Sequence, residues 1–287
     1  MVNHKAELAV YKYLDDVTQG KSVMSDAVIN KITEDIKDAL HRQFNSKREE
    51  FKFRMSNVGR PSCQLWWEKN HPKKRMPKPN TFIINMFIGD VIEALFKGLL
   101  TEAGVSFKNS DSVTLKTNKN NISGTYDLLI DGYVDDIKSA SDWSYKHKFD
   151  SSDSLKNGDS FGYVGQLAGY AVASNSKLGG WWVVNKNNGQ FKYVKAKNIN
   201  VQDEIAKIEK TIKRANSKKL QRCFEPEPEK FRGKATGNKI LDKTCSFCVY
   251  RKDCWPNLVQ RPAVMSKAVS PKLVDYVELR KEYRNAG

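Results

Sequence analysis

The segment from residue 124 to residue 138, GTYDLLIDGYVDDIK, constrains the fold of this 287-residue chain more than any other. Asp131-Gly132 is a two-residue turn signal between runs rich in Leu, Ile, Tyr and Val, the composition of β-strands. A turn at these two residues places Asp127 opposite Asp136. The sequence therefore predicts a β-hairpin with two opposed carboxylates.

The register of this hairpin separates a charged face from an apolar one, because side chains alternate along a strand. One face carries Asp127, Asp136 and Lys138; the other is expected in the core and carries Tyr126, Leu128, Ile130, Tyr133 and Ile137. Opposed Cβ atoms are only about 4.5–5.5 Å apart, so two carboxylates there repel unless a cation or proton lies between them. The pattern predicts a metal-dependent phosphodiesterase site. The alternative is that these acids only solvate an exposed face, as Asp135 would.

The order of three motifs resembles the PD-(D/E)XK nuclease superfamily, in particular its RecB-like branch. The motifs are Asp127, then Asp136-Ile137-Lys138, then the Gln-x-x-x-Tyr sequence from Gln166 to Tyr170. In that branch an upstream helix contributes Gly-x-x-x-His, and here the segment from Gly89 to Glu93 matches it with glutamate in place of histidine. Tyr126 stands where the family name has proline. The resemblance covers about residues 60 to 256.

The resemblance implies an α/β fold: a restriction-endonuclease-like core with a central mixed sheet flanked by helices. It also implies oxygen ligands for Mg²⁺ or Mn²⁺, namely Glu93, Asp127, Asp136 and the carbonyl of Ile137. Such an ion would orient and acidify the attacking water. The remaining catalytic residues would be Lys138, which stabilises developing negative charge or helps position the attacking water, and Gln166 and Tyr170 on the helix.

Four cysteines extend the resemblance: Cys63, Cys245, Cys248 and Cys254. The C-x2-C-x5-C spacing with one distant upstream cysteine is similar to the "iron staple" of RecB-like nucleases that hold a [4Fe–4S] cluster, among them helicase–nuclease subunits and CRISPR adaptation exonucleases. By count alone, four cysteines suit zinc equally well. The resemblance favours iron–sulfur with a structural role. Cys223 is left over as a free thiol, or alternatively replaces Cys63 as the fourth ligand.

Composition indicates a polyanionic partner. Lys and Arg number 49 against 33 acidic residues, a net charge of +16. This balance steers association through phosphate contacts, although many basic proteins bind no nucleic acid. No apolar run reaches the roughly 18 residues of a membrane span, and the first 30 residues lack a signal-peptide pattern. We therefore expect a cytoplasmic protein with reduced thiols and no membrane association, in the host cytoplasm if a phage encodes it.

Basic and aromatic residues alternate between residues 45 and 80, a composition that suits single-stranded nucleic acid. Trp66 and Trp67 would either stack on bases or shield the cluster. The polar segment 139–160 is expected to be a mobile loop over the site. The expected nucleic-acid contacts are Arg60, Trp143, Lys146 and Lys148.

Three segments are expected within one compact unit: a helical N-terminal segment (1–80) with the first cluster cysteine, a nuclease core (81–222), and a cysteine-cluster segment (223–287) ending in a helix over 266–287. A helix from Ser25 should bury Ile29, Ile32, Ile36, Leu40 and Phe44, which recur every three to four residues. A helix over 82–100 should bury Ile88, Val91, Ile92, Leu95 and Leu99. A basic helix is expected over 201–222.

The function expected from these features is a metal-dependent DNA exonuclease acting on single strands or unpaired ends, in recombination, repair or phage DNA processing. The alternatives are a structure-specific endonuclease or nickase, and a DNA-binding subunit of a helicase–nuclease complex. The chain has no helicase P-loop, so unwinding would require a helicase or recombination partner. Its four histidines lie in no nucleophile–base context, which gives a serine or cysteine hydrolase little support.

Overall fold

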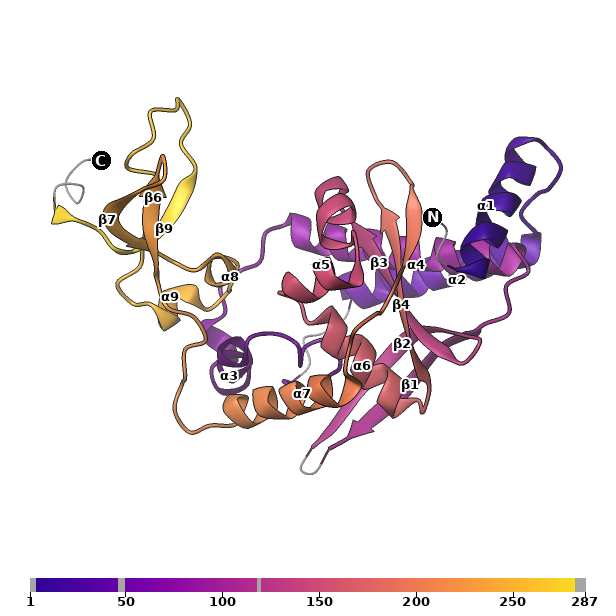
Figure 1. The fold of residues 1–287 in the computed structure, drawn as a ribbon, viewed down its shortest axis with the longest axis horizontal. Helices are drawn as coiled ribbons and strands as arrows, with labels where there is room; N and C mark the ends of the chain where they lie inside the picture. Colours follow the sequence, from indigo (N-terminus) through magenta and orange to yellow (C-terminus); the bar gives the residue numbers. More distant parts are fainter. Residues whose placement is uncertain (1–3, 46–49, 118–119, 282–287) are drawn as a thin grey trace. The chain divides into compact units, whose positions relative to one another are not determined.

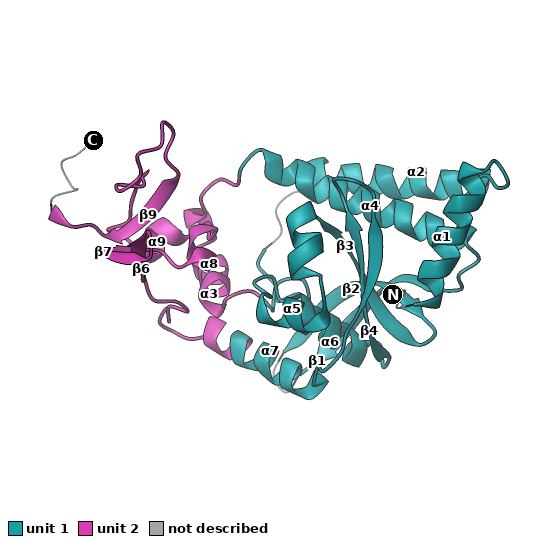
Figure 2. Ribbon diagram, turned by 45° about the horizontal axis from the view of Figure 1, so that its top comes forward, with its two compact units in different colours: residues 1–59, 79–211 teal, residues 60–78, 212–287 magenta. Residues whose placement is uncertain are grey.

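The computed structural model describes residues 4–45, 50–117 and 120–281. The chain forms two compact units, where one had been expected (Figure 2). Unit 1 comprises residues 1–59 and 79–211, and unit 2 comprises residues 60–78 and 212–287. Residues 60–78, which carry Cys63, therefore group with the C-terminal segment that carries the other cysteines.

Unit 1 is built on a five-stranded mixed sheet flanked by helices, which confirms the α/β class (Figure 1). The strands follow the order β1 (Lys108–Lys116), β2 (Asn121–Ile130), β3 (Tyr133–Ala140), β4 (Lys177–Asn185) and β5 (Phe191–Lys195). Only β3 and β4 pair in parallel; the other neighbours are antiparallel. The flanking helices are α1 (Lys5–Thr18), α2 (Asp26–Leu40), α4 (Thr81–Glu102), α6 (Tyr163–Ala173) and α7 (Val201–Ala215).

The predicted hairpin is present in the predicted register. Ile130 pairs with Tyr133, and the ladder continues to the pair of Leu128 with Asp135. Both turn residues have positive φ (49° at Asp131 and 78° at Gly132), as a type I′ turn requires. The turn sequence thus determines which side chains of the two strands share a face.

One core lies between helices α1 and α4 and the sheet: Ala6, Val10, Phe96, Leu100, Leu128, Ile130, Ile137, Trp182, Phe191 and Tyr193. The buried face of α4 differs from the predicted one, because Leu95 is 44% exposed while Ala94, Phe96 and Gly98 are buried. Packing explains why a different face of the helix is buried. The Phe96 ring contacts Trp182 at 5.3 Å, and a Cβ at Gly98 would lie 2.5 Å from an Ile32 methyl.

The N-terminal helices are confirmed, but the predicted stripe on α2 is only partly buried. The Ser25 side chain caps α2 by accepting the Val28 N–H. The side chains of Ile29, Leu40 and Phe44 remain exposed, while Val28 and Ala39 are buried. The prediction of a helix was therefore correct, whereas the prediction of which side chains it buries was correct only in part.

The segment between β3 and β4, predicted to be a mobile loop, is largely helical. It contains a π-helix (Ser144–Lys148) and α5 (Ser152–Asn157) before α6. The Ser151 side chain caps α5 by accepting the Ser154 N–H. Parallel strands need a long crossover connection, and these helices provide it.

Unit 2 contains a second sheet, which the sequence analysis missed. Its antiparallel strands follow the order β6 (Glu227–Phe231), β7 (Lys234–Ile240), β9 (Leu273–Glu278) and β8 (Val259–Pro262), with the short helices α3 (Ser62–Asn70), α8 (Lys243–Ser246) and α9 (Arg251–Cys254). The predicted helix over 266–287 is therefore wrong for its described part, and residues 282–287 lie outside the described residues. Tyr276 of β9 is fully buried, and its hydroxyl donates a hydrogen bond of 2.6 Å to Glu229 of β6 in the same sheet. Local periodicity in the sequence does not reveal this long-range contact.

Candidate functional site

Asp136 and Lys138 form a buried ion pair on β3. The Lys138 ammonium lies 2.5 Å from Asp136 Oδ2. Burial raises the pKa of Asp136 above its ordinary value, although Lys138 opposes that rise. Burial alone would lower the pKa of Lys138, but the negative charges of Asp136 and Asp127 outweigh it and raise that pKa. Lys138 therefore stays protonated at neutral pH.

Asp127 of β2 lies beside this pair. Its Oδ2 accepts the backbone N–H of Ile137 at 2.7 Å, one residue beyond the last hairpin pair. Burial and then the charge of Asp136 raise the pKa of Asp127 to about 7. The structure thus brings the two predicted carboxylates together, and Ile137 contributes its N–H to their arrangement.

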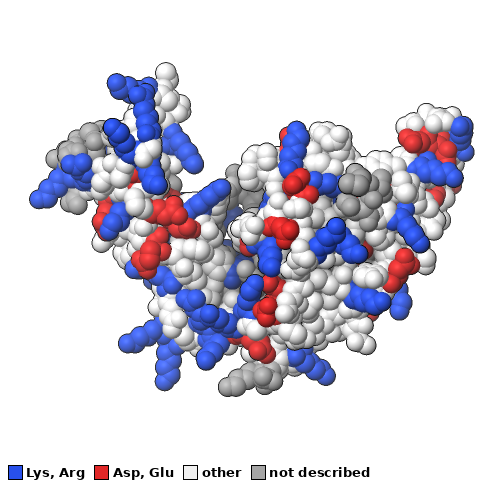
Figure 3. All heavy atoms as spheres, in the orientation of Figure 1, with Lys and Arg blue, Asp and Glu red and all other residues white. Residues whose placement is uncertain are grey.

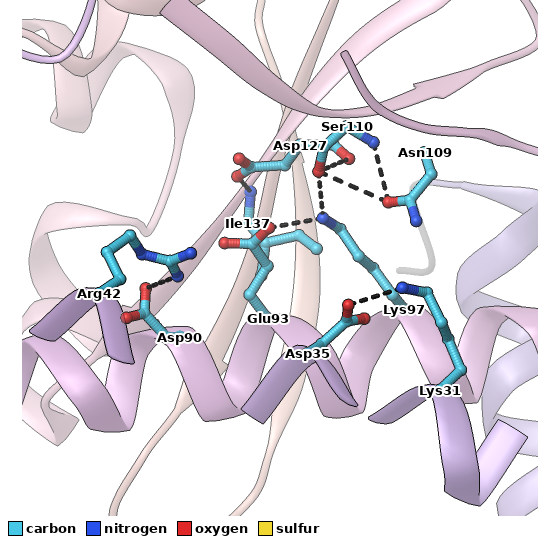
Figure 4. Close-up of polar contacts among 10 residues, drawn as sticks. All are labelled: Lys31, Asp35, Arg42, Asp90, Glu93, Lys97, Asn109, Ser110, Asp127 and Ile137. Carbon is cyan, nitrogen blue, oxygen red and sulfur yellow. Dashed lines mark hydrogen bonds and ion pairs between the residues drawn. The ribbon is translucent and has the colours of Figure 1, made fainter. Parts of the chain in front are cut away.

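Glu93 reaches the same site from helix α4, pointing toward Asp127 and Ile137 (Figure 4). Lys97, one turn later on the helix, lies 2.5 Å from Glu93 Oε1 and donates to Ser110 Oγ of β1 at 2.6 Å. Burial and the charge of Asp127 raise the pKa of Glu93, while Lys97 lowers it. Lys97 is only 8% exposed and was missed in the sequence, although its i,i+4 spacing from Glu93 was visible there.

Helix α6 presents the predicted Gln-x-x-x-Tyr motif to these charges. Gln166 donates its amide to the Tyr170 hydroxyl at 3.2 Å. Burial and the nearby charge of Asp136 raise the pKa of Tyr170. The Tyr163 ring, one turn before Gln166, lies 5.1 Å from the Lys138 ammonium. The helix therefore lines one side of the carboxylate site.

The donor chemistry of the site fits a divalent cation. Carboxylate oxygens are the ligands that Mg²⁺ and Mn²⁺ prefer, and the charges of Glu93 and Asp136 act on each other as well as on Asp127. Within the described residues, no three His, Cys, Asp or Glu side chains converge closely enough to hold one ion together. Lys138 and Lys97 instead neutralise two of the carboxylates. A cation held by Asp127 and Asp136 would add to this neutralisation.

Asp135 is not the solvating residue that the hairpin pattern allowed. It is fully buried, and its Oδ1 accepts the Gly180 N–H at 2.7 Å and the Tyr193 hydroxyl at 2.9 Å. Between Val134 and Asp136, strand β4 carries one residue more than β3, so a bulge lies directly opposite Asp135. A Cβ at Gly179 would stand 2.1 Å from Asp135 Oδ1, so only glycine fits there. Asp135 thus fixes the strand register next to Asp136.

Asp135 should make stability fall with pH. Burial raises its pKa to about 7, whereas an unfolded aspartate titrates near 3.9. Its contribution to stability is therefore present below about pH 4 and is lost as the pH rises through 7. Between pH 5 and pH 8, the unfolding free energy of the wild type should therefore fall by about 2 kcal/mol more than that of Asp135→Asn, which has no carboxyl group to titrate there. Urea unfolding followed by tryptophan fluorescence measures this difference, with the exposed Asp203→Asn as control. Parallel pH profiles for wild type and Asp135→Asn would contradict it.

The predicted nucleic-acid contacts occupy different surroundings. Trp143 is 63% exposed and packs on His147, and Lys146 forms an exposed ion pair with Asp142 at 2.9 Å. Lys148 lies against aromatic rings of the segment that leads into α6. Arg60 belongs to unit 2, where it lies 3.6 Å from Glu68. Three of the four thus share the crossover segment that follows β3.

A second candidate site is a pocket in unit 2 that all four predicted cluster ligands line. Its walls are Pro61, Cys63, Gln64, Trp67, Phe224, Thr244, Cys245, Cys248, Arg251, Cys254 and Trp255. Burial raises the pKa of Cys245 to about 12, and the charges of Asp242, Cys248 and Cys254 add to that rise. A bound cation would reverse this effect, because coordinated thiols are deprotonated.

Protein contacts alone already join the two cysteine-bearing segments. Trp67 is buried and its ring is stacked with that of Tyr250 at 6.0 Å, and Lys74 pairs with Asp253 at 3.1 Å. The backbone N–H of Met76 donates to the Val249 carbonyl at 2.9 Å. Trp67 therefore shields the pocket, which is the second of the two predicted roles.

Cys223 lies against Cys63. Its sulfur accepts the backbone N–H of Cys63 at 3.2 Å and lies 3.3 Å from Ser62 Oγ. These contacts occupy the N-terminus of α3, where helix N–H groups lack internal partners. A hydrogen bond between the two thiols raises the pKa of Cys63 and lowers that of Cys223 to about 5. Cys223 thus has a local role as a helix cap and lies outside the pocket lining.

The thiols line one pocket without forming a single-ion site. Four cysteines lie along its walls, yet within the described residues no three His, Cys, Asp or Glu side chains approach closely enough to hold one metal ion together. By the chemistry of their thiols, four cysteines can ligate zinc or an iron–sulfur cluster.

No protein-family profile matches this chain, and no curated protein matches it. Among solved structures, the crystal structure of SSO0001 aligns at 14% identity and a TM-score of 0.43, covering 76% of this chain and 94% of that one. None of the helices in the described ranges has the length and apolar character that a membrane crossing needs.

Proposed function

We propose that this chain is a metal-dependent deoxyribonuclease that hydrolyses phosphodiester bonds. The observation that carries the proposal is that Asp127, Asp136 and Lys138 lie beside one another at one partly buried site of unit 1. Glu93 reaches toward the same site from helix α4. Two carboxylates beside a permanently charged lysine match the needs of the reaction. The carboxylates bind the divalent cation, and the lysine stabilises charge on the phosphoryl oxygens.

Each residue has a distinct role in the proposed reaction. Asp127 and Asp136 would hold Mg²⁺ or Mn²⁺, and the bound ion would acidify a water molecule and neutralise negative charge. Lys138 is kept protonated by Asp136 and faces the phosphate. Gln166, anchored on the Tyr170 hydroxyl, orients water or phosphate. The resemblance to RecB-like nucleases agrees with these assignments and extends them to a nuclease core.

The substrate we favour is single-stranded DNA or an unpaired end, attacked as an exonuclease in recombination, repair or phage DNA processing. Lys and Arg side chains are spread over the visible face of each unit, with Asp and Glu among them (Figure 3). The net charge of +16 supports a polyanionic substrate. A structure-specific endonuclease with the same site is the second candidate.

The cysteine pocket is proposed to hold a [4Fe–4S] cluster through Cys63, Cys245, Cys248 and Cys254. When bound, the cluster would cross-link residues 60–78 to the C-terminal half of unit 2. We assign it a structural role, because it would add a cross-link between two segments that protein contacts also join.

The test compares linear and circular single-stranded DNA of the same sequence, with Mn²⁺ and with Asp136→Asn as the blank. Loss of the linear strand alone is expected, because an exonuclease needs an end. Loss of both strands would replace the exonuclease by the endonuclease. Loss of neither by iron-replete protein would contradict the proposed nuclease activity and favour a DNA-binding subunit.

A further inference from the structure

A stack of three aromatic rings leads from the protein interior to the surface beside Lys138. Phe149 is buried and stacks on Tyr163 at 5.9 Å with an interplanar angle of 24°. Tyr163 in turn stacks on Phe161 at 5.6 Å and 14°. Phe161, the outermost ring, is 59% exposed. The stack thus ends in a ring largely open to solvent.

Two lysines connect this stack to the carboxylate site and give it positive charge. The Lys138 ammonium lies 5.1 Å from the centre of the Tyr163 ring while it pairs with Asp136. The Lys148 ammonium lies 4.6 Å from the Phe161 ring and 4.5 Å from the Tyr163 ring. The exposed ring is therefore continuous with the lysine that would face the scissile phosphate.

Close contacts and hydrogen bonds restrain the backbone on both sides of Phe161. Gly162 has φ of 76°, and a Cβ there would lie 2.2 Å from the Cα of Gly59. The Asp159 carboxylate accepts the N–H groups of Tyr163 and Val164 at 2.9 and 2.8 Å, which caps α6. An aromatic side chain on such a support loses little conformational entropy when a ligand packs on it.

We propose that Phe161 is a platform on which an unpaired base stacks, next to the phosphate that Lys138 contacts. The inference rests on the proposed nuclease function and gives it a substrate preference: single strands over duplexes. A duplex already stacks its bases on one another and offers no free base face except at its ends. Unpaired bases stack readily on aromatic side chains, and lysines beside the ring hold the backbone.

The experiment measures DNA affinity in the full, iron-replete chain carrying Asp136→Asn, so that cleavage does not interfere. Fluorescence anisotropy compares a labelled oligo(dT) strand with a labelled, covalently closed circular duplex, which has neither ends nor unpaired loops. Phe161→Ala and Phe161→Leu should each weaken single-strand binding roughly tenfold, because stacking on one ring contributes about that factor. Phe161→Trp should retain binding, and the duplex affinity should not change.

Matched controls separate stacking from charge and from general surface effects. Leu8→Ala removes a comparably exposed apolar side chain from α1 and should leave single-strand binding at the wild-type value. The dependence of affinity on salt should keep its slope in Phe161→Ala, because the ring carries no charge. Wild-type affinity in Phe161→Ala, full retention in Phe161→Leu, or equal losses on strand and duplex would each overturn the proposal.

Failure of the platform and failure of the nuclease function give different results. Cleavage is followed in parallel in chains with native Asp136. If the native chain cleaves and Phe161→Ala binds and cleaves single strands equally well, the platform is overturned and the nuclease function stands. If the native chain cleaves nothing while binding still depends on the ring, the nuclease function is overturned and the platform stands.

Discussion

Lys138→Met should lower phosphodiester cleavage by about 10²–10³-fold, the usual loss when one electrostatic group that stabilises the transition state is removed. The substitution keeps the length of the side chain and removes its charge. In wild type this charge is fixed beside the reacting phosphate because Asp136, 2.5 Å away, keeps Lys138 protonated. The measurement is single-turnover cleavage of a linear DNA strand at saturating Mn²⁺.

The same variant separates catalysis from metal binding. Without divalent metal, Lys138→Met leaves the buried Asp136 and Asp127 without their main cation, which costs on the order of 3–5 kcal/mol of stability. Mn²⁺ should therefore raise the melting temperature of Lys138→Met by more than that of wild type. Lys31→Met, which breaks the ion pair with Asp35 on α2, is the matched control and should change neither quantity. A wild-type cleavage rate in Lys138→Met would exclude the assigned role.

The hairpin shows how much of this site can be predicted from sequence. The turn type followed from Asp131-Gly132, and the alternation of strand side chains then placed Asp127 and Asp136 together. Both steps are local, because the turn fixes the register over a few residues. The parts of the fold that depended on local periodicity, such as α2 and α4, were correct in extent and less so in the face that is buried.

Features that depend on distant packing could not be predicted. Asp135 lies in the same hairpin, but its burial depends on a bulge at Gly179 in a strand some forty positions later. Lys97 pairs with Glu93 at helical spacing, but it also donates to Ser110 on strand β1, a contact that the helix sequence does not reveal. The sheet of unit 2 pairs β7 with β9, and short strands of mixed polarity give little local signal. Long-range contacts therefore determined what the sequence analysis missed.

Single cysteine variants should differ strongly in iron content, according to whether the substituted residue ligates the cluster. Ala at Cys245, Cys248 or Cys254 should reduce iron from about four atoms per chain to near zero, because each residue would ligate one iron. Loss of the cluster should also reduce the yield of soluble protein, since folding and metal binding are coupled. The measurements are iron content and visible absorbance of anaerobically purified protein.

Cys63 and Cys223 decide which thiol is the fourth ligand. Cys63 lines the pocket with the other three cysteines. Cys223 is not among the lining residues, and its sulfur accepts the Cys63 N–H instead. Cys63→Ala should therefore lose the iron, and Cys223→Ala should keep it with a loss of only about 1 kcal/mol of stability, the usual effect of removing a helix cap. The reverse result would make Cys223 the ligand. Full iron content in both single variants, lost only in the double variant, would mean that either thiol can complete the site.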